Sequence, residues 1–253
     1  MNKKTFFIHS PTITGAHGFT LIELMLTLVI STMIIAAISS VYVAQQKSQV
    51  TQDQVIEMQQ NLRAAMNIFS SEIRMAGYRP PTAVNINPGI VTATSSRFRF
   101  TWDSNENDSL TTPLVDLNED IEYGFSLADD ADLDGFADNG AASLGRQVTN
   151  GGLAGGFQPI ADNIVAIEFF YVLEDLSDNG AYDPPTTLTP TATEINDIRA
   201  VTVSILARAD RPDQGFNNNM SYTTASGAIW NGFNDNFRRR LLVTTVYLRN
   251  IGL

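Results

Sequence analysis

The strongest constraint on the fold is one apolar stretch near the start of the chain. Between Glu23 and Lys47 the only ionisable residue is Tyr42. Residues 24–44 provide 21 mostly apolar positions, and at about 1.5 Å per residue a helix of that length crosses a bilayer. A carboxylate at the bilayer centre costs roughly 2.5–3.5 kcal/mol. The sequence therefore predicts a membrane-length helix whose acid, Glu23, needs a compensating partner.

A helical pattern continues beyond this stretch. After Lys47 the chain is more polar, yet apolar residues recur at steps of three and four, which is the spacing of one helix face. They are Val55, Met58, Leu62, Ala65, Phe69, Ile73 and Ala76. The pattern assigns Glu57, Arg63 and Glu72 to the opposite, polar face. We interpret the apolar stripe as a surface that packs on a globular head.

The same helix has a clear predicted end. No proline occurs between Pro11 and Pro80, and Gly77 precedes that second proline by three positions. A glycine followed by proline is a typical stop signal for a helix. We therefore predict a nearly continuous helix from Phe19 to about Ala76, roughly 85 Å long.

Composition excludes several classes of function. The net charge is −11, which disfavours binding to nucleic acid through overall charge. The chain has no cysteine, and both histidines, His9 and His17, precede Gly18. A chain cut after Gly18 would lack disulfides, thiolate or imidazole metal ligands and a Ser-His-Asp triad. We therefore expect that the protein is not an enzyme.

Residues 18–23, "GFTLIE", stand immediately before the apolar helix. This motif resembles the processing site of type IV pilins and type II secretion pseudopilins. The resemblance implies that a prepilin peptidase cuts between Gly18 and Phe19 on the cytoplasmic side and methylates the amine of Phe19. It also implies that Glu23 pairs with the N-terminal amine of a neighbouring subunit and sets the filament register. The alternative reading is an interfacial acid near the lipid headgroups.

The pilin resemblance implies an α+β fold in which a long N-terminal α-helix packs against an antiparallel β-sheet head with long loops. The expected parts are a leader at 1–18, a transmembrane and filament-core half of the helix at 19–46, an amphipathic half at 47–79 and a β-rich head at 80–253. Within the head, β-like runs alternate with polar loops. These runs are 96–102, 120–125, 163–173, 198–207 and 241–248. Two intervening linkers, 128–158 and 177–197, are unusually long.

Two further segments make the resemblance to pilins more specific. Residues 69–80, "FSSEIRMAGYRP", and 238–250, "RRRLLVTTVYLRN", resemble the helix end and the terminal strand of PilW-type minor pilins. The resemblance implies a role in a priming or tip complex, with other minor pilins, the major pilin and an inner-membrane assembly platform as partners. It implies a single-pass inner-membrane protein with a periplasmic head that later joins the surface filament. Arg238, Arg239 and Arg240 are either a solvated charge run or a contact patch.

An acidic loop, residues 129–140, "DDADLDGFADNG", follows the spacing of a calcium loop. The candidate ligands are Asp130, Asp132, Asp134 and Asp138. Gly135 occupies the sixth position, but Ala141 stands at the twelfth, where an EF-hand requires a bidentate glutamate. We therefore reject an EF-hand and expect either a partial calcium site or an acidic surface turn. Calcium is the only cofactor that the sequence suggests.

Two weaker acidic loops, 103–108 and 175–183, share some of this character. Two alternatives to the minor pilin also remain open. One is a type II secretion pseudopilin of the J type, which shares the cleavage motif, helix and β head. The other is a membrane-tethered, calcium-dependent binding or adhesion module that never enters a filament.

Overall fold

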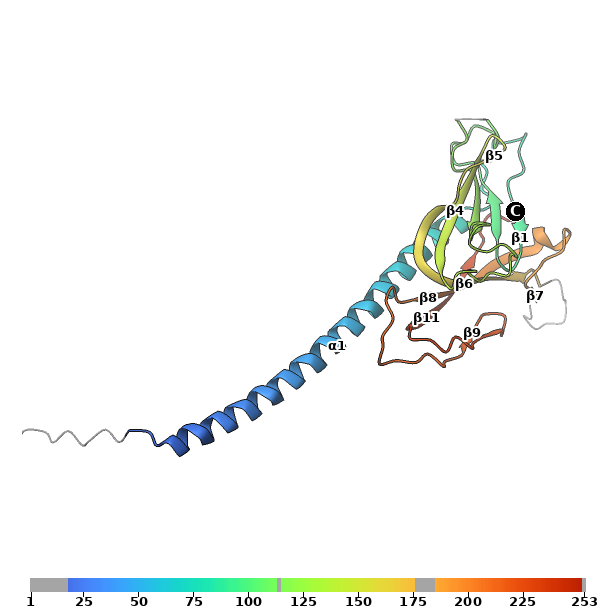
Figure 1. Ribbon diagram of the computed structural model, residues 1–253. Helices are drawn as coiled ribbons and strands as arrows, with labels where there is room; N and C mark the ends of the chain where they lie inside the picture. Colours follow the sequence, from blue (N-terminus) through green and yellow to red (C-terminus); the bar gives the residue numbers. More distant parts are fainter. Residues whose placement is uncertain (1–17, 113–114, 176–184, 252–253) are drawn as a thin grey trace, which may run out of the picture. The chain divides into compact units, whose positions relative to one another are not determined.

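The computed structural model describes residues 18–112, 115–175 and 185–251, so most of the expected leader lies outside the described residues. The chain divides into two compact units, one ending at Val50 and the other running from Thr51 to Leu253. The described part of the first unit is dominated by helix α1 (Leu21–Ile73), which continues into the second unit. The second unit is a large antiparallel β head (Figure 1). The predicted α+β class is confirmed.

Helix α1 has nearly the predicted limits. It begins one residue after Thr20 and ends at Ile73, followed by turns rather than further α-helix. The amides of Met75 and Ala76 bond three residues back, which tightens the last turn. Gly77 then adopts a φ of +78°, a conformation that glycine tolerates best. The predicted stop signal at this glycine is therefore confirmed.

The apolar stripe of the helix packs on the head within the second unit. Its buried members are Met58, Leu62, Ala65, Phe69, Ile73 and Ala76, with Met66 beside them. Val55 is only half-buried. The ring of Phe69 lies 4.3 Å from that of Tyr123 and 6.2 Å from that of Phe169, measured between centroids. The stripe is thus a packing surface, as the sequence predicted.

The head contains one nine-stranded sheet in which each pair is antiparallel, with the main order β1-β2-β3-β4-β6-β8-β11. Its strands are β1 (Ile90–Ala93), β2 (Phe98–Thr101), β3 (Asp120–Gly124), β4 (Ala142–Asn150), β5 (Leu153–Ala154), β6 (Gln158–Leu173), β7 (Thr186–Thr187), β8 (Ile198–Arg208) and β11 (Arg239–Tyr247). A separate hairpin pairs β9 (Tyr222–Thr223) with β10 (Ile229–Trp230), and η1 (Glu194–Asp197) precedes β8. All five predicted runs overlap strands, namely β2, β3, β6, β8 and β11.

The prediction of a long linker at 128–158 is wrong, because this segment contains the central strand β4. This strand has few apolar residues, and Leu144 is its one buried large side chain. A Cβ on Gly145 would lie 2.9 Å from the Phe157 side chain, so the strand needs a residue without a side chain there. The linker at 177–197 likewise contains β7 and η1, although 176–184 lie outside the described residues.

Strands β6 and β8 are buried on both faces, which explains their nearly continuous apolar sequences. On one face Ile167 and Ile205 join the main core beneath the helix. On the other face Val165 and Leu206 join a smaller core. That smaller core also contains Tyr222 and Trp230, with Phe136, Phe233 and Leu241 packed against it. The head is therefore layered, with the sheet between two apolar clusters.

Glu72 lies toward the sheet and not on the predicted polar face. Its Oε2 accepts a hydrogen bond from the Tyr123 hydroxyl and another from Arg146 Nε at 2.8 Å. Tyr123 is fully buried; that burial raises its pKa, and the neighbouring Glu72 charge raises it further. Spacing along the helix could not reveal these partners, because they come from β3 and β4.

Candidate functional site

The expected cleavage site lies just ahead of the helix. Gly18, Phe19 and Thr20 form no helix or strand, and Phe19 is 87% exposed. A peptide bond in exposed, irregular backbone is accessible to a peptidase. The geometry is thus compatible with cutting between Gly18 and Phe19.

Glu23 and Thr20 form a capping box at the start of α1. The backbone amide and the hydroxyl of Thr20 each donate to Glu23 Oε2 at 2.9 Å, and the Glu23 amide donates back to Thr20 Oγ1 at 3.3 Å. This reciprocal pattern satisfies amides that a helix start leaves unpaired. The T-x-x-E spacing of Thr20 and Glu23 is the usual sequence signature of such a box, although it was not among the predictions above. Thr20 donates hydrogen bonds to the Glu23 carboxylate, but it carries no positive charge that could neutralise this acid.

The N-terminal part of α1 presents apolar side chains outward. Its most apolar window has a mean hydropathy of 2.4 with none of its residues buried. Leu21, Ile22, Met33 and Ile38 are each more than 60% exposed. By length and composition this helix can cross a membrane. Its exposed apolar surface requires lipid or neighbouring helices as a partner.

The structure brings three of the four predicted calcium ligands together. Carboxylate oxygens of Asp130, Asp132 and Asp134 lie within 4.8 Å of one another. We call residues 130–135 the first acidic loop. Asp138 is not part of this group, and its Oδ2 instead accepts a hydrogen bond from the Ala131 amide at 3.0 Å. The fourth predicted ligand is therefore held within the loop backbone.

Backbone hydrogen bonds shape the first acidic loop. Asp130 is buried and its two oxygens accept from the amides of Asp134 and Gly135, each at 3.1 Å. Burial raises the pKa of Asp130. Gly135 has a φ of +87°, and a Cβ there would lie 2.5 Å from the Ile167 carbonyl oxygen. The glycine at the sixth position is thus required by the fold.

A second acidic loop, described over residues 103–112 and 115–119, buries three carboxylates between β2 and β3. They belong to Asp103, Asp116 and Glu119. Burial favours a raised pKa for Asp116, but hydrogen bonds from neighbours including Ser109 and Asn107 outweigh it and lower the pKa to about 2. Of this loop, only residues 103–108 were predicted from the sequence. The other weak loop, 175–183, lies almost entirely outside the described residues.

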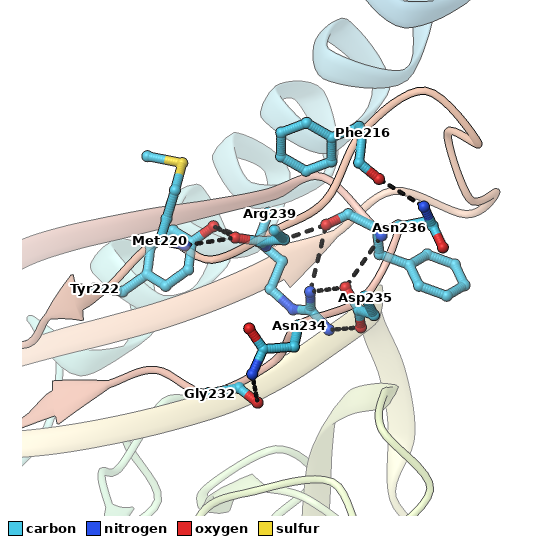
Figure 2. Close-up of polar contacts among 10 residues, drawn as sticks. Phe216, Met220, Tyr222, Gly232, Asn234, Asp235, Asn236 and Arg239 are labelled. Atoms are coloured by element: carbon cyan, nitrogen blue, oxygen red, sulfur yellow. Dashed lines mark hydrogen bonds and ion pairs between the residues drawn. The ribbon is translucent and has the colours of Figure 1, made fainter.

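Two of the three arginines at the start of the last strand, Arg238–Arg240, have partners within the head. Arg239 forms a two-bond ion pair with Asp235, each bond 2.6 Å long, and its side chain is 3% exposed (Figure 2). It also lies 4.1 Å from the centroid of the Phe233 ring. Arg238 pairs with Asp213 at 2.8 Å. Arg240 is exposed, whereas Arg238 is only partly buried.

Two family models match the sequence. Residues 13–39 match the prokaryotic N-terminal methylation motif, and residues 132–250 match the type IV pilus-assembly protein W family. A solved structure that it resembles is a type IV-like pilin from Thermus thermophilus, at 14% identity and a TM-score of 0.45. That match covers 77% of this chain and 97% of the pilin chain. No curated protein matches the sequence.

The methylation motif covers the exposed cleavage segment and the apolar part of α1, and the second match covers most of the β head. The chain is therefore similar to prepilins in its N-terminal methylation motif and to the type IV pilus-assembly protein W family over residues 132–250. Proteins of these kinds are structural and not enzymatic.

Proposed function

We propose that this protein is a PilW-type minor pilin, and that it acts in the complex that primes filament growth or occupies the filament tip after a prepilin peptidase cuts between Gly18 and Phe19. The observation that carries the proposal is the combination of a methylation motif at 13–39 with a PilW match over the head. The match to a pilus-assembly family favours the pilus over a secretion pseudopilin. A head with this topology provides the surface that selects neighbouring pilins.

In this proposal the apolar part of α1 occupies two environments in turn, the inner membrane and then the filament. The apolar part of α1 is first stored in the inner membrane with the head in the periplasm. Assembly then moves the helix into the filament, where neighbouring pilin helices replace lipid around its exposed apolar side chains. The partners in this sequence are the peptidase, the assembly platform, the major pilin and other minor pilins.

Processing gives the first test. We expect that co-expression with a prepilin peptidase yields a chain that begins with N-methylated Phe19, because the peptide bond before it is exposed and irregular. Intact mass and N-terminal sequencing identify the product directly. Expression without the peptidase is the control and should give the uncut chain. A chain that stays uncut, or is cut elsewhere, contradicts the proposal and favours a permanently anchored binding module.

We also propose that the first acidic loop holds calcium through Asp130, Asp132 and Asp134. The convergence of three carboxylates within 4.8 Å supports it, because a hard dication offsets their repulsion. The buried Asp130 would otherwise keep a charge away from water without a cationic partner in the loop. Asp138 would contribute indirectly, by fixing the Ala131 amide.

The prediction for this loop concerns thermal stability. Calcium at about 100 times its dissociation constant adds about 2.7 kcal/mol, which for a head of this size raises Tm by roughly 5–10 °C. Asp132→Asn should remove most of this increase and change Tm little in the presence of a chelator, because Asp132 is exposed. Calorimetry of both proteins with calcium and with chelator measures the effect. Equal melting of the wild type in both conditions rejects the site.

A further inference from the structure

The two edges of the nine-stranded sheet differ in how open they are to another strand. At one edge lies β1, which has four residues, a register shift between Ile90 and Thr92, and a proline, Pro88, shortly before it. Short length, bulges and proline are common devices that stop a sheet edge from pairing with another chain. At the other edge lies β11, which has none of these devices.

Strand β11 is long and regular. All nine of its residues pair with β8 without a register shift. Its segment 241–247, "LLVTTVY", contains no charged residue, proline or glycine. A long, uncharged edge strand is a template for pairing with another chain. Among the described residues β11 pairs with β8 alone, so its outer edge is open to a further strand.

The register with β8 shows which main-chain groups of β11 point away from the sheet. The Ala209 amide donates to the Arg238 carbonyl at 2.8 Å, and the Leu248 amide donates to the Arg199 carbonyl at 2.9 Å. Both bonds join directly opposed residues, and in an antiparallel ladder such bonded pairs alternate with unbonded pairs. Even-numbered residues from 238 to 248 therefore bond to β8. The odd-numbered residues direct their N–H and C=O groups outward, and they include Leu241, Val243, Thr245 and Tyr247.

The side chains of these odd-numbered residues share one face of the sheet. Leu241 packs there against the smaller core. The Thr245 hydroxyl lies 2.9 Å from that of Thr202. Val243 and Tyr247 are 42% and 68% exposed. In strand addition, main-chain hydrogen bonds provide affinity and alternate side chains provide specificity, and this edge offers both kinds of contact.

Two exposed arginines bracket the uncharged segment. Arg240 precedes it and Arg249 follows it. Neither belongs to any of the ion pairs found among the described residues. The edge is therefore basic at both ends, in a chain whose net charge is −11. Because opposite charges stabilise neighbouring strands, the complementary strand has an acidic residue at each end.

The same charges disfavour a second copy of this chain as the partner. Antiparallel pairing of two β11 strands over residues 241–247 would bring Arg249 of each copy close to Arg240 of the other. Parallel pairing would bring each arginine close to its own counterpart. Like charges would meet at both ends in either case, and such pairs destabilise neighbouring strands. The charges thus favour a different chain.

We propose that the outer edge of β11 is a docking site for an extended segment of another protein, which adds a strand to the sheet. The centre of that segment is uncharged and pairs with residues 241–247. An acidic residue at each of its ends meets Arg240 or Arg249. The site depends neither on cleavage after Gly18 nor on an ion in the first acidic loop.

The probe is a synthetic ten-residue peptide with glutamate at both ends and alternating threonine and valine between them. At about 3.4 Å per residue, such a strand spans the interval from Arg240 to Arg249. We expect saturable binding to the full chain in detergent, measured by fluorescence anisotropy of the labelled peptide. The same peptide with lysine at both ends should bind at least about tenfold more weakly, and added salt should reduce this difference.

Val243→Pro tests the edge itself. Proline removes the outward N–H of this residue and leaves the bonds between β11 and β8 in place, and edge strands tolerate proline at such positions. We expect this variant to weaken binding of the glutamate-ended peptide by at least about tenfold. Val243→Ala is the matched control: it shortens the same side chain but keeps the N–H, and should change affinity by less than about threefold.

Two further measurements keep the test valid if Val243→Pro destabilises the head. The first replaces a central valine of the peptide by proline, which leaves the protein unchanged and should abolish saturable binding. The second combines Arg240→Glu with Arg249→Glu. Both positions are exposed, so the head should fold normally, and the double variant should prefer the lysine-ended peptide.

Four outcomes would overturn the proposal. One is the absence of saturable binding of the glutamate-ended peptide to the wild type, and another is equal binding by the wild type and Val243→Pro. A third is binding that survives proline in the peptide, because the charged ends would then bind without strand pairing. The fourth is a concentration-dependent dimer of the wild type that Val243→Pro dissociates, since a second copy would then occupy the edge.

Discussion

Glu23→Ala is expected to leave the protein inserted in the membrane and cleaved, yet to reduce its incorporation into filaments by more than about tenfold. The change keeps the apolar span at 24–44 and the cleavage site. It removes the carboxylate that would meet a neighbouring subunit's amine. An ion left unpaired in a low-dielectric bundle costs roughly 3–5 kcal/mol, and about 1.4 kcal/mol already corresponds to tenfold.

The capping box makes Glu23→Gln the more informative variant. Glutamine can replace glutamate at the third helical position of a capping box, so this variant keeps the bonds to Thr20 but loses the charge. Thr20→Ala does the opposite, because it removes the cap, at about 1 kcal/mol, and leaves the carboxylate. If charge pairing sets the filament register, Glu23→Gln should behave like Glu23→Ala, whereas Thr20→Ala should assemble nearly normally.

Immunoblots of sheared filaments against the membrane fraction measure incorporation, and intact mass confirms cleavage. A Glu23→Gln protein that enters filaments as well as the wild type would show that the acid serves the helix cap alone. In that case the register must come from other contacts. The measurement therefore separates the local role of Glu23, which hydrogen bonds define, from its proposed role between subunits.

The helix and five of the strands were predictable because each carries its own periodicity. The steps of three and four from Met58 to Ala76 reflect burial of one helix face, and β6 and β8 carry nearly continuous apolar runs because both of their faces are buried. Strand β4 was not predictable in this way. It is buried at Leu144, Gly145 and Thr149, and half-exposed polar residues hide its alternation.

The acidic residues likewise divide into those that sequence spacing identified and those that it did not. Short spacing identified Asp130, Asp132 and Asp134, because a turn brings alternate residues of one loop together. It missed the buried Asp116 and Glu119, which accept hydrogen bonds from Asn107 and Ser104 only because the turns between β2 and β3 bring these residues together. Sequence spacing detects side chains that share one turn. Contacts that the fold brings from further along the chain require the structure.

Glu72 is the other case of a contact that the sequence could not reveal, and it gives the second large prediction. Glu72→Ala is expected to lower the free energy of unfolding of the head by roughly 3 kcal/mol, because it leaves Arg146 with an unpaired, mostly buried charge. The Arg146 side chain is 13% exposed and Tyr123 is fully buried. Glu57→Ala, at an exposed position of the same helix, is the matched control and should cost less than about 0.5 kcal/mol.

A double-mutant cycle tests whether the cost comes from the unpaired arginine or from lost packing. Adding Arg146→Met to Glu72→Ala removes the stranded charge, so the double variant should be more stable than Glu72→Ala alone. Denaturant unfolding of the four proteins measures the coupling. Strictly additive effects would mean that the ion pair contributes little and that Glu72 acts mainly as the acceptor for the Tyr123 hydroxyl. A coupling of about 1–3 kcal/mol would instead make this pair a principal polar link between α1 and the sheet.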